Sequence, residues 1–500
     1  MLSTTIHKFY VGDILRSGCD TIVVLTRGKD IELIKNIDEK LGNLFKKVVE
    51  TGDFKGDVGE IVLLYPASNT NVKRYVVASI GNEGLEGIRI AVANAILKVK
   101  DLSERTLIFI PKDLVPKIAD AIEQSIISVE LSLYDTGSKY KVREKKEIKI
   151  KEVYYSSNDG VDHGPKIDKG LKIASAVNYA RDIANAPPSI MDPEGIEEEA
   201  RKLAKEYGLN IKVYYYEDLK KLGLNGIIAV GSGGGVKPRL IILEYRGREE
   251  DKWDLAVIGK TVTFDAGGLD LKRPESMVDM KFDKSGGAAV LGIIKGLAEL
   301  KLPVNVIAAL PAVENLPGPK AYKPRDVIRM YNDLTVEIGN TDAEGRIILA
   351  DTLSFIEKNY APQRMIDLAT LTGAIVIALG NHAIGLFSND DEFANELIDI
   401  GNFVGEKLWR MPLWKEYYEQ LKSDVADTNN VGGRPAGAIT AAAFLSKFIE
   451  NTKWIHLDIA GTAWVQQYGP NKPYYPKGAT GIGVRLILYY LLVKIVKYRK

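Results

Sequence analysis

The first third of the chain alternates apolar runs of strand length with segments of helical periodicity. Apolar residues recur at helical spacing in 90–99 and 115–125, which predicts a helix in each segment. Four runs predict strands around them: Thr21–Thr26, Glu60–Tyr65, Arg74–Ser79 and Thr106–Ile110. Strands that alternate with helices indicate an α/β domain.

All periodicity stops between residues 156 and 165, where the sequence is rich in Ser, Asn, Asp, Gly and Pro. A chain of 500 residues also exceeds what one hydrophobic core usually organises. We therefore expect two α/β domains, a smaller one at residues 1–160 and a larger one at residues 161–500.

The second domain begins with two helical patterns. The first extends from about Ile167 to Ala186, and the second covers Pro193–Tyr207, with Asp192 as its N-cap. Two apolar runs then predict strands: Leu240–Glu244 and Leu255–Ile258.

Charged residues gather on a turn before the longest helical pattern of this domain. Asp342, Glu344 and Arg346 follow a strand-like alternation at 334–338 and precede an apolar helical run that starts at Ile347. Open α/β sheets bind their ligands at the carboxyl ends of strands, so this turn is a candidate active site. The alternative is an ordinary helix start, because the turn is rich in good N-cap residues and a Glu in the first turn complements the helix dipole.

Two further junctions carry groups of the same kind. Lys260 follows the predicted strand Leu255–Ile258, and Asp265 comes five residues later. Lys272 follows, and Asp283 directly precedes an apolar helical segment whose positive end would lie near the carboxylate. If the sheet is parallel, all three junctions converge at one edge.

Such a cluster indicates divalent metal ions. Four carboxylates in a small volume repel one another and raise one another's pKa unless a strong counter-charge is present. Oxygen ligands suit Mn²⁺ or Mg²⁺, and Zn²⁺ also accepts Asp and Glu. Two ions about 3.5 to 4 Å apart polarise a carbonyl or phosphoryl group and activate a shared water. The pattern therefore predicts a hydrolase, and it suits peptide hydrolysis and phosphoryl transfer equally well.

The sequence lacks the residue patterns that other kinds of catalytic site need. The four histidines show no HExxH spacing, and His456 between two apolar residues is expected to be a core residue. No G-x-S-x-G elbow accompanies a plausible Asp and His, and Cys19 lies beside nothing that would activate it.

Composition narrows the partners. With 67 basic and 66 acidic side chains, the chain shows no electrostatic commitment to nucleic acid or to a membrane surface, so neither is an expected partner. A single cysteine and a start without a signal-peptide pattern favour the cytoplasm. The apolar run Leu486–Val493 is too short to span a bilayer, so we expect a buried element there.

Several motifs together resemble the leucyl (cytosol) aminopeptidase family of metallopeptidases. These are GKTVTFDAGGLDLK, MKFDKSGGAAVLG, NTDAEGR, TLTGA and HLDIAGTAW. The resemblance extends from about Gly170 to the end of the chain. It implies a catalytic domain with a central mixed sheet flanked by helices, and a smaller, macro-like α/β domain at the N-terminus.

The resemblance also implies roles for the charged residues. Asp265 and Glu344 would bridge two divalent ions, Mn²⁺ or Zn²⁺. Asp342 would complete one site, and Lys260 and Asp283 the other, with the lysine bound as a neutral amine.

The remaining roles concern the substrate. Lys272 would polarise the scissile carbonyl, which a water shared by the ions attacks, and Arg346 would hold a bicarbonate ion as general base. Five residues match positions that contact the substrate: Met280, Leu371, Gly373, Ala460 and Ala463. The implied activity is removal of an N-terminal residue, preferably leucine or another bulky apolar residue, from peptides. The implied assembly is a homohexamer.

Three positions depart from the family pattern. Thr261 stands where Gly is common, Ala266 where Thr or Ser is common, and Lys284 where Met is common. Lys284 places a further cation beside a metal ligand. Three alternatives remain at this point: a two-metal phosphatase or nuclease, a DNA-binding regulator with the same fold, and a catalytically silent member. The absence of a basic track argues against a nuclease, and the intact charged positions argue against silence.

Overall fold

The computed structural model describes residues 5–66, 71–136, 138–141, 148–466 and 472–496. The chain forms two compact units. One contains residues 1–175 together with 471–476, and the other contains residues 176–470 together with 477–500.

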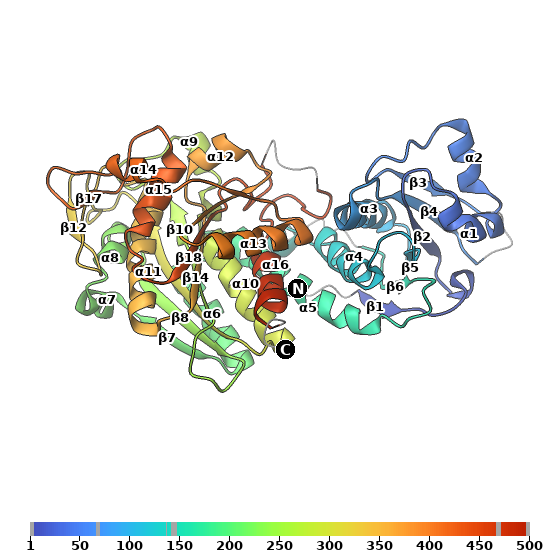
Figure 1. Cartoon of the computed structure of the whole chain (residues 1–500), viewed down its shortest axis with the longest axis horizontal. Coiled ribbons are helices and arrows are strands. Elements are labelled where there is room, and N and C mark those ends of the chain that lie inside the picture. Colours follow the sequence, from blue (N-terminus) through green and yellow to red (C-terminus); the bar gives the residue numbers. More distant parts are fainter. Residues whose placement is uncertain (1–4, 67–70, 137, 142–147, 467–471, 497–500) are drawn as a thin grey trace. The chain divides into compact units, whose positions relative to one another are not determined.

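The first unit is built on a six-stranded sheet with the order β1-β6-β5-β2-β4-β3 (Figure 1). Its strands are β1 (Ile6–Phe9), β2 (Thr21–Thr26), β3 (Ile61–Leu64), β4 (Arg74–Ser79), β5 (Arg105–Phe109) and β6 (Glu152–Ser156). All neighbours pair in parallel except β3 and β4. The four predicted strands are present, with ends that differ by at most one residue.

Helices of the first unit cover the sheet. They are α1 (Lys35–Lys40), α2 (Leu44–Thr51), α3 (Gly84–Val99) and α4 (Ile118–Ser132). Both predicted helices form, but α3 begins six residues earlier than expected, and α4 begins three residues later and ends seven residues later. Pro116 accounts for part of the later start of α4, because a proline disfavours helical geometry at the residue before it, Val115. Two buried apolar clusters, one containing Val23 and the other Ile22, fill opposite faces of β2.

The second unit contains a large mixed sheet with the order β16-β15-β18-β14-β9-β11-β8-β7, and β10 pairs with β11. Its strands are β7 (Asn210–Tyr214), β8 (Arg239–Arg246), β9 (Leu255–Gly259), β10 (Thr261–Asp265), β11 (Asn305–Asn315), β14 (Arg364–Ala369), β15 (Ile384–Ser388), β16 (Leu408–Arg410) and β18 (Lys453–Asp458). The neighbours β18, β14, β9 and β11 are parallel, so their carboxyl ends share one edge. Strand β8 is antiparallel to both of its neighbours, β11 and β7, whereas β15 is antiparallel to β18 and parallel to β16.

Helices flank both faces of this sheet (Figure 1). They are α6 (Pro193–Tyr207), α7 (Tyr216–Leu222), α8 (Asn225–Gly231), α9 (Pro274–Met277), α10 (Ser285–Leu300), α11 (Glu344–Tyr360), α12 (Gly373–Leu379), α13 (Asp391–Val404), α14 (Lys415–Glu419), α15 (Gly437–Ser446) and α16 (Val484–Tyr490). A long helix, α5 (Gly164–Asn185), begins in the first unit and ends in the second. The predicted α/β fold with two domains and a central mixed sheet is confirmed.

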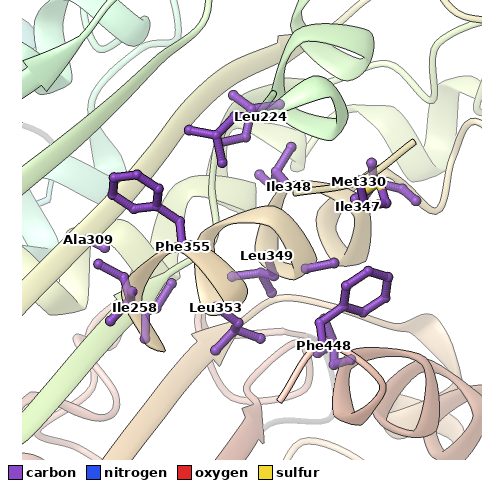
Figure 2. Packing of buried hydrophobic residues seen from close by; sticks show 14 of the residues in the cluster. Leu224, Ile258, Ala309, Met330, Ile347, Ile348, Leu349, Leu353, Phe355 and Phe448 are labelled. Carbon is purple, nitrogen blue, oxygen red and sulfur yellow. The ribbon is translucent and has the colours of Figure 1, made fainter. Parts of the chain in front are cut away.

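Helix α11 is central to the core of the second unit. Figure 2 shows its apolar side chains, among them Leu349 and Leu353, between residues of the sheet such as Ile258 and residues outside it such as Phe448, in the turn after α15. Every residue from Glu344 to Ile356 is buried, which is the pattern of a helix enclosed on all sides. The first turn of this helix is therefore held rigidly.

Around the turn before α11, one local prediction was wrong, and the alternative of an ordinary capped helix start is not supported. The strand before it, β13 (Thr335–Glu337), does not belong to the large sheet; it pairs with β12 (Val327–Arg329) and β17 (Thr428–Asn429) in a separate small sheet. The N-cap of α11 is Ala343, which makes no side-chain capping bond. The polar residues of the turn are therefore available for another purpose.

The predicted helix Pro193–Tyr207 forms with these bounds as α6, and Asp192 accepts a hydrogen bond from the Gly195 amide as its N-cap. The apolar run near the end of the chain forms α16 and continues as a π-helical turn, Leu491–Ile495. Residues Leu486–Leu491 are buried, as expected, whereas Leu492 and Val493 at the end of the predicted run are half-buried. None of the helices in the described ranges is long and apolar enough to cross a bilayer.

Candidate metal centre

Close backbone packing places the charged residues at the carboxyl edge of the large sheet. A Cβ atom on Gly259, at the end of β9, would lie 2.5 Å from the Gly286 carbonyl oxygen. One on Gly286 would lie 2.1 Å from the Leu368 carbonyl oxygen. The first turn of α10 therefore touches the backbone of β9 and β14. This contact brings Asp283, just before α10, to the end of the strand that precedes Lys260.

Two lysines and four carboxylates meet at this edge. The Lys260 ammonium lies 2.8 Å from Asp283 Oδ1 and 2.8 Å from Glu344 Oε1. The Lys272 ammonium lies 2.8 Å from Asp265 Oδ2 and 2.5 Å from Asp342 Oδ1. Four of these residues are almost fully enclosed, with exposed fractions of 1 to 4%: Lys260, Asp265, Asp283 and Glu344. The three predicted junctions therefore do converge.

The four carboxylates outnumber the two lysine cations that neutralise them, and the pKa values of two of the carboxylates are raised. Burial, with the nearby charges of Glu344 and Asp265, raises the pKa of Asp283 to about 7, although Lys260 opposes the shift. Burial and the Asp265 charge raise the pKa of Asp342 to about 7. Burial alone would lower the pKa values of Lys260 and Lys272, but the surrounding carboxylates outweigh this effect. They raise the pKa of both lysines and hold both ammonium groups charged.

The donor set fits divalent cations. Asp265, Asp342 and Glu344 each offer a carboxylate oxygen, and these atoms lie within 4.8 Å of one another. Asp283 Oδ2 is buried and has no hydrogen-bond partner among the described residues. Hard oxygen ligands at this spacing suit Mn²⁺, Mg²⁺ or Zn²⁺, and a bound ion would offset the burial and the repulsion that raise the pKa values of Asp283 and Asp342.

Several residues that the sequence did not single out hold the ligands in place. Asn315, the last residue of β11, donates from Nδ2 to Asp265 Oδ1 at 2.9 Å. Thr370 donates its hydroxyl to Asp283 Oδ1 at 2.7 Å, and its carbonyl oxygen accepts a bond from the Lys260 ammonium at 2.9 Å. Both lie at strand ends, but nothing in the sequence distinguishes them from other polar residues at such ends.

Arg346 is buried in the second half of the first turn of α11. Its Nη1 donates to the Asn430 carbonyl oxygen at 2.8 Å, and its Nε has no hydrogen-bond partner among the described residues. Burial lowers the pKa of its guanidinium to about 10. Within the described part of the chain, no carboxylate forms an ion pair with it. A buried, unpaired guanidinium is suited to an anion.

The predicted substrate residues lie on segments next to the cluster. Met280 is in the 3-10 turn Met280–Lys284 that carries Asp283. Leu371 follows Thr370, and Gly373 begins α12 with open space where a Cβ would project. Ala460 and Ala463 are buried on the segment after β18. The Leu371 and Ala460 amides donate to the same carboxylate, that of Asp458.

The side chains of Lys284 and His456 form hydrogen bonds with groups outside the cluster of lysines and carboxylates. The Lys284 ammonium is fully buried and donates to the carbonyl oxygens of Ala186 and Lys281, and burial lowers the pKa of this group to about 7. The departure from the family pattern therefore places its amine at the end of α5. His456 is a core residue, as predicted; its Nδ1 lies 2.6 Å from Asp367 Oδ1.

Comparison with known proteins identifies the family of this chain. The model of the cytosol aminopeptidase family catalytic domain matches residues 178–488, and that of the family's N-terminal domain matches residues 22–141. A probable cytosol aminopeptidase of Roseiflexus castenholzii is 41% identical over 459 residues, covering 90% of this chain and 93% of that protein. The one from Aquifex aeolicus is 40% identical over 494 residues, covering 97% and 98%.

Two solved structures are also similar to this chain over nearly its full length. A mutant of tomato leucine aminopeptidase superposes with a TM-score of 0.87 at 28% identity, covering 98% of this chain and 96% of that one. The bottromycin maturation enzyme BotP, solved in complex with Mn, has a TM-score of 0.82 at 30% identity, covering 94% and 98%.

The fold and the acidic cluster thus define a two-domain metallopeptidase. The chain belongs to the cytosol aminopeptidase family and is a metal-dependent aminopeptidase, which confirms the predicted family and reaction class.

Proposed function

We propose that this protein removes the N-terminal residue, preferably leucine or another bulky apolar residue, from peptides by means of two divalent ions, Mn²⁺ or Zn²⁺. The observation that carries the proposal is the buried convergence of four carboxylates and two lysines from three segments at one sheet edge. Two ions bound there would polarise the peptide carbonyl and lower the pKa of an attacking water.

The ligands divide naturally into two sets. Asp265 and Glu344 would bridge the ions, with Asp342 on one side and Lys260 with Asp283 on the other. The Lys260 amine can bind an ion only after losing its proton, so metal binding should release protons. Its present contacts with Asp283 and Glu344 support this division, because they hold the amine beside both carboxylates.

Lys272 supplies the charge that the reaction needs at the carbonyl oxygen. It is held between Asp265 and Asp342 and is more exposed than Lys260, so it can reach a substrate. A fixed cation beside a developing oxyanion stabilises the transition state. Arg346 would hold a bicarbonate ion as general base; its buried, unpaired guanidinium supports this role.

The substrate would lie along the segments after β14 and β18. Leu371 and Gly373 would contact its backbone, and Met280, Ala460 and Ala463 would form the walls of the pocket for its first side chain. Small and apolar walls favour a bulky apolar residue over a charged one.

The family resemblance extends the proposal beyond the site. We assign residues 1–160 to a macro-like N-terminal domain and residues 161–500 to the catalytic domain. We further propose a cytoplasmic homohexamer that acts on peptides.

The test is hydrolysis of leucine p-nitroanilide by purified protein after chelation and after restoring Mn²⁺, Zn²⁺ or Mg²⁺. The proposal requires release that depends on metal and is lost in Asp342→Ala. A folded, metal-loaded wild-type protein that releases nothing with any of these ions would exclude leucine-type specificity.

A further inference from the structure

The buried carboxylate of Asp458, at the end of β18, lies outside the proposed metal ligands and is 1% exposed. Its Oδ1 accepts hydrogen bonds from the Leu371 amide at 3.1 Å and the Ala460 amide at 3.2 Å. Its Oδ2 accepts one from the Thr372 hydroxyl at 2.7 Å. One side chain therefore binds both segments that carry the proposed substrate contacts.

These two segments leave neighbouring parallel strands at the same level. Ala369, the last residue of β14, pairs with Asp458, and the Ile459 amide donates to the Ala369 carbonyl oxygen at 2.8 Å. The pairing of β14 and β18 ends at these residues. Beyond them, the Asp458 carboxylate connects the two segments. Three hydrogen bonds converge on this one buried side chain, so the connection is stiff.

The first segment is also tied to the metal centre. Thr370 donates to Asp283 and accepts from Lys260, and the next two residues donate to Asp458. Leu371 is therefore fixed relative to the proposed ions on one side and relative to Ala460 on the other.

We infer that Asp458 is a positioning residue for catalysis: it sets the spacing between the backbone contact at Leu371 and the side-chain pocket at Ala460, and so determines where the scissile bond lies relative to the ions. The inference rests on the proposed function. Its alternative is that Asp458 only stabilises the fold, as any satisfied buried carboxylate does.

Asp367 provides a matched control. It lies on β14, is fully buried, and accepts hydrogen bonds from the Trp454 indole at 2.8 Å and from His456 at 2.6 Å. It has the same chemistry in the same pair of strands, but neither of these bonds reaches the substrate segments.

The experiment compares Asp458→Asn and Asp367→Asn in the metal-loaded full-length protein. For each we would measure KM and kcat for leucine and alanine p-nitroanilides, metal content and Tm. Asp458→Asn should raise KM for the leucine substrate about tenfold or more and narrow the preference for leucine over alanine, with metal content unchanged. Asp367→Asn should lower Tm and leave both kinetic values near those of the wild type.

Wild-type KM and selectivity in folded Asp458→Asn, or a KM change that comes with loss of metal, would overturn the inference. If that variant does not fold, Thr372→Val and Thr372→Ser decide. The Val variant removes the hydroxyl, which donates to Asp458 and accepts from the Ile375 amide as the N-cap of α12, and should raise KM. The Ser variant keeps both bonds and should behave like wild type; equal KM values for the two variants would overturn the inference. A wild-type protein without leucine p-nitroanilide hydrolysis contradicts the proposed function itself, which is a distinct result.

Discussion

At the scale of single residues, the two lysines of the cluster have different surroundings. Lys260 lies between Asp283 and Glu344 and is 3% exposed, whereas the side chain of Lys272 is 13% exposed. The first is placed to bind an ion as an amine, and the second to face a substrate as a cation. Their separate removal should therefore have different effects.

We predict that Lys272→Met lowers kcat about 100- to 1000-fold while both ions stay bound, because one charged donor to the oxyanion is lost. The measurement is kcat for leucine p-nitroanilide together with metal analysis. Lys295→Met is the control, since Lys295 pairs with Glu299 on α10 and has no role in the site. Unchanged kcat in Lys272→Met would remove this lysine from the mechanism.

The carboxylate pKa values predict how the metal-free protein responds to pH. Asp283 and Asp342 have folded-state pKa values of about 7, above the usual value near 4, because burial favours their neutral forms. Their contribution to stability is complete below pH 4 and is lost as pH rises through 7. We expect the Tm of the chelated protein to fall between pH 5 and pH 8, and added Mn²⁺ to raise Tm more at pH 8 than at pH 5.5.

Thermal unfolding at a series of pH values checks this prediction. Asp283→Asn, which cannot ionise, should have a smaller decrease in Tm over the same range. A Tm of the chelated wild-type protein that stays level or rises from pH 5 to pH 8 would show that these carboxylates are not destabilised by burial.

At the scale of elements, the contact between α10 and the ends of β9 and β14 builds the site. We predict that Gly286→Ala costs about 1 to 3 kcal/mol or more, because its Cβ would lie 2.1 Å from the Leu368 carbonyl oxygen, and that it weakens metal binding by moving Asp283. Urea unfolding and metal titration measure the two effects. Gly235→Ala, whose Cβ would lie 3.8 Å from Glu314, should stay within about 0.5 kcal/mol of wild type.

The sequence predicted elements well where periodicity or capping was strong. The helix with Asp192 and Pro193 at its start matches α6, and the strand Arg74–Ser79 matches β4. The turn before α11 was harder, because alternation at 334–338 is equally compatible with a small separate sheet, and good N-cap residues do not cap when they bind other groups. Sheet membership depends on tertiary pairing, which a local pattern does not contain.

At the scale of the whole molecule, the chain has two units with separate cores, and the proposed ligands all belong to the second. We predict that chelation lowers the unfolding temperature of the second unit only, since a ligand stabilises the part that binds it. Calorimetry of the full-length protein with Mn²⁺ and with chelator should show one transition that moves and one that does not. Two transitions that move together would contradict this.

The cluster itself could be predicted from the sequence, because Lys260, Asp265, Asp283, Asp342 and Glu344 all stand at strand or helix ends. The residues that hold this cluster and the substrate segments in place could not be predicted from the sequence. Asn315, Thr370 and Asp458 are common residue types whose partners lie tens of positions away in the chain, so only the fold reveals what they hold.

The most direct test of the two-ion centre is a count of tightly bound ions per chain in wild type, Asp342→Ala and Asp283→Ala. After loading with Mn²⁺ and gel filtration, elemental analysis should find two ions in the wild type and about one in each variant, because each substitution removes a ligand of one site only. Hydrolysis of leucine p-nitroanilide should fall sharply in both. A wild-type protein that holds one ion or none while cleaving the substrate, or variants that keep two, would contradict the proposed centre.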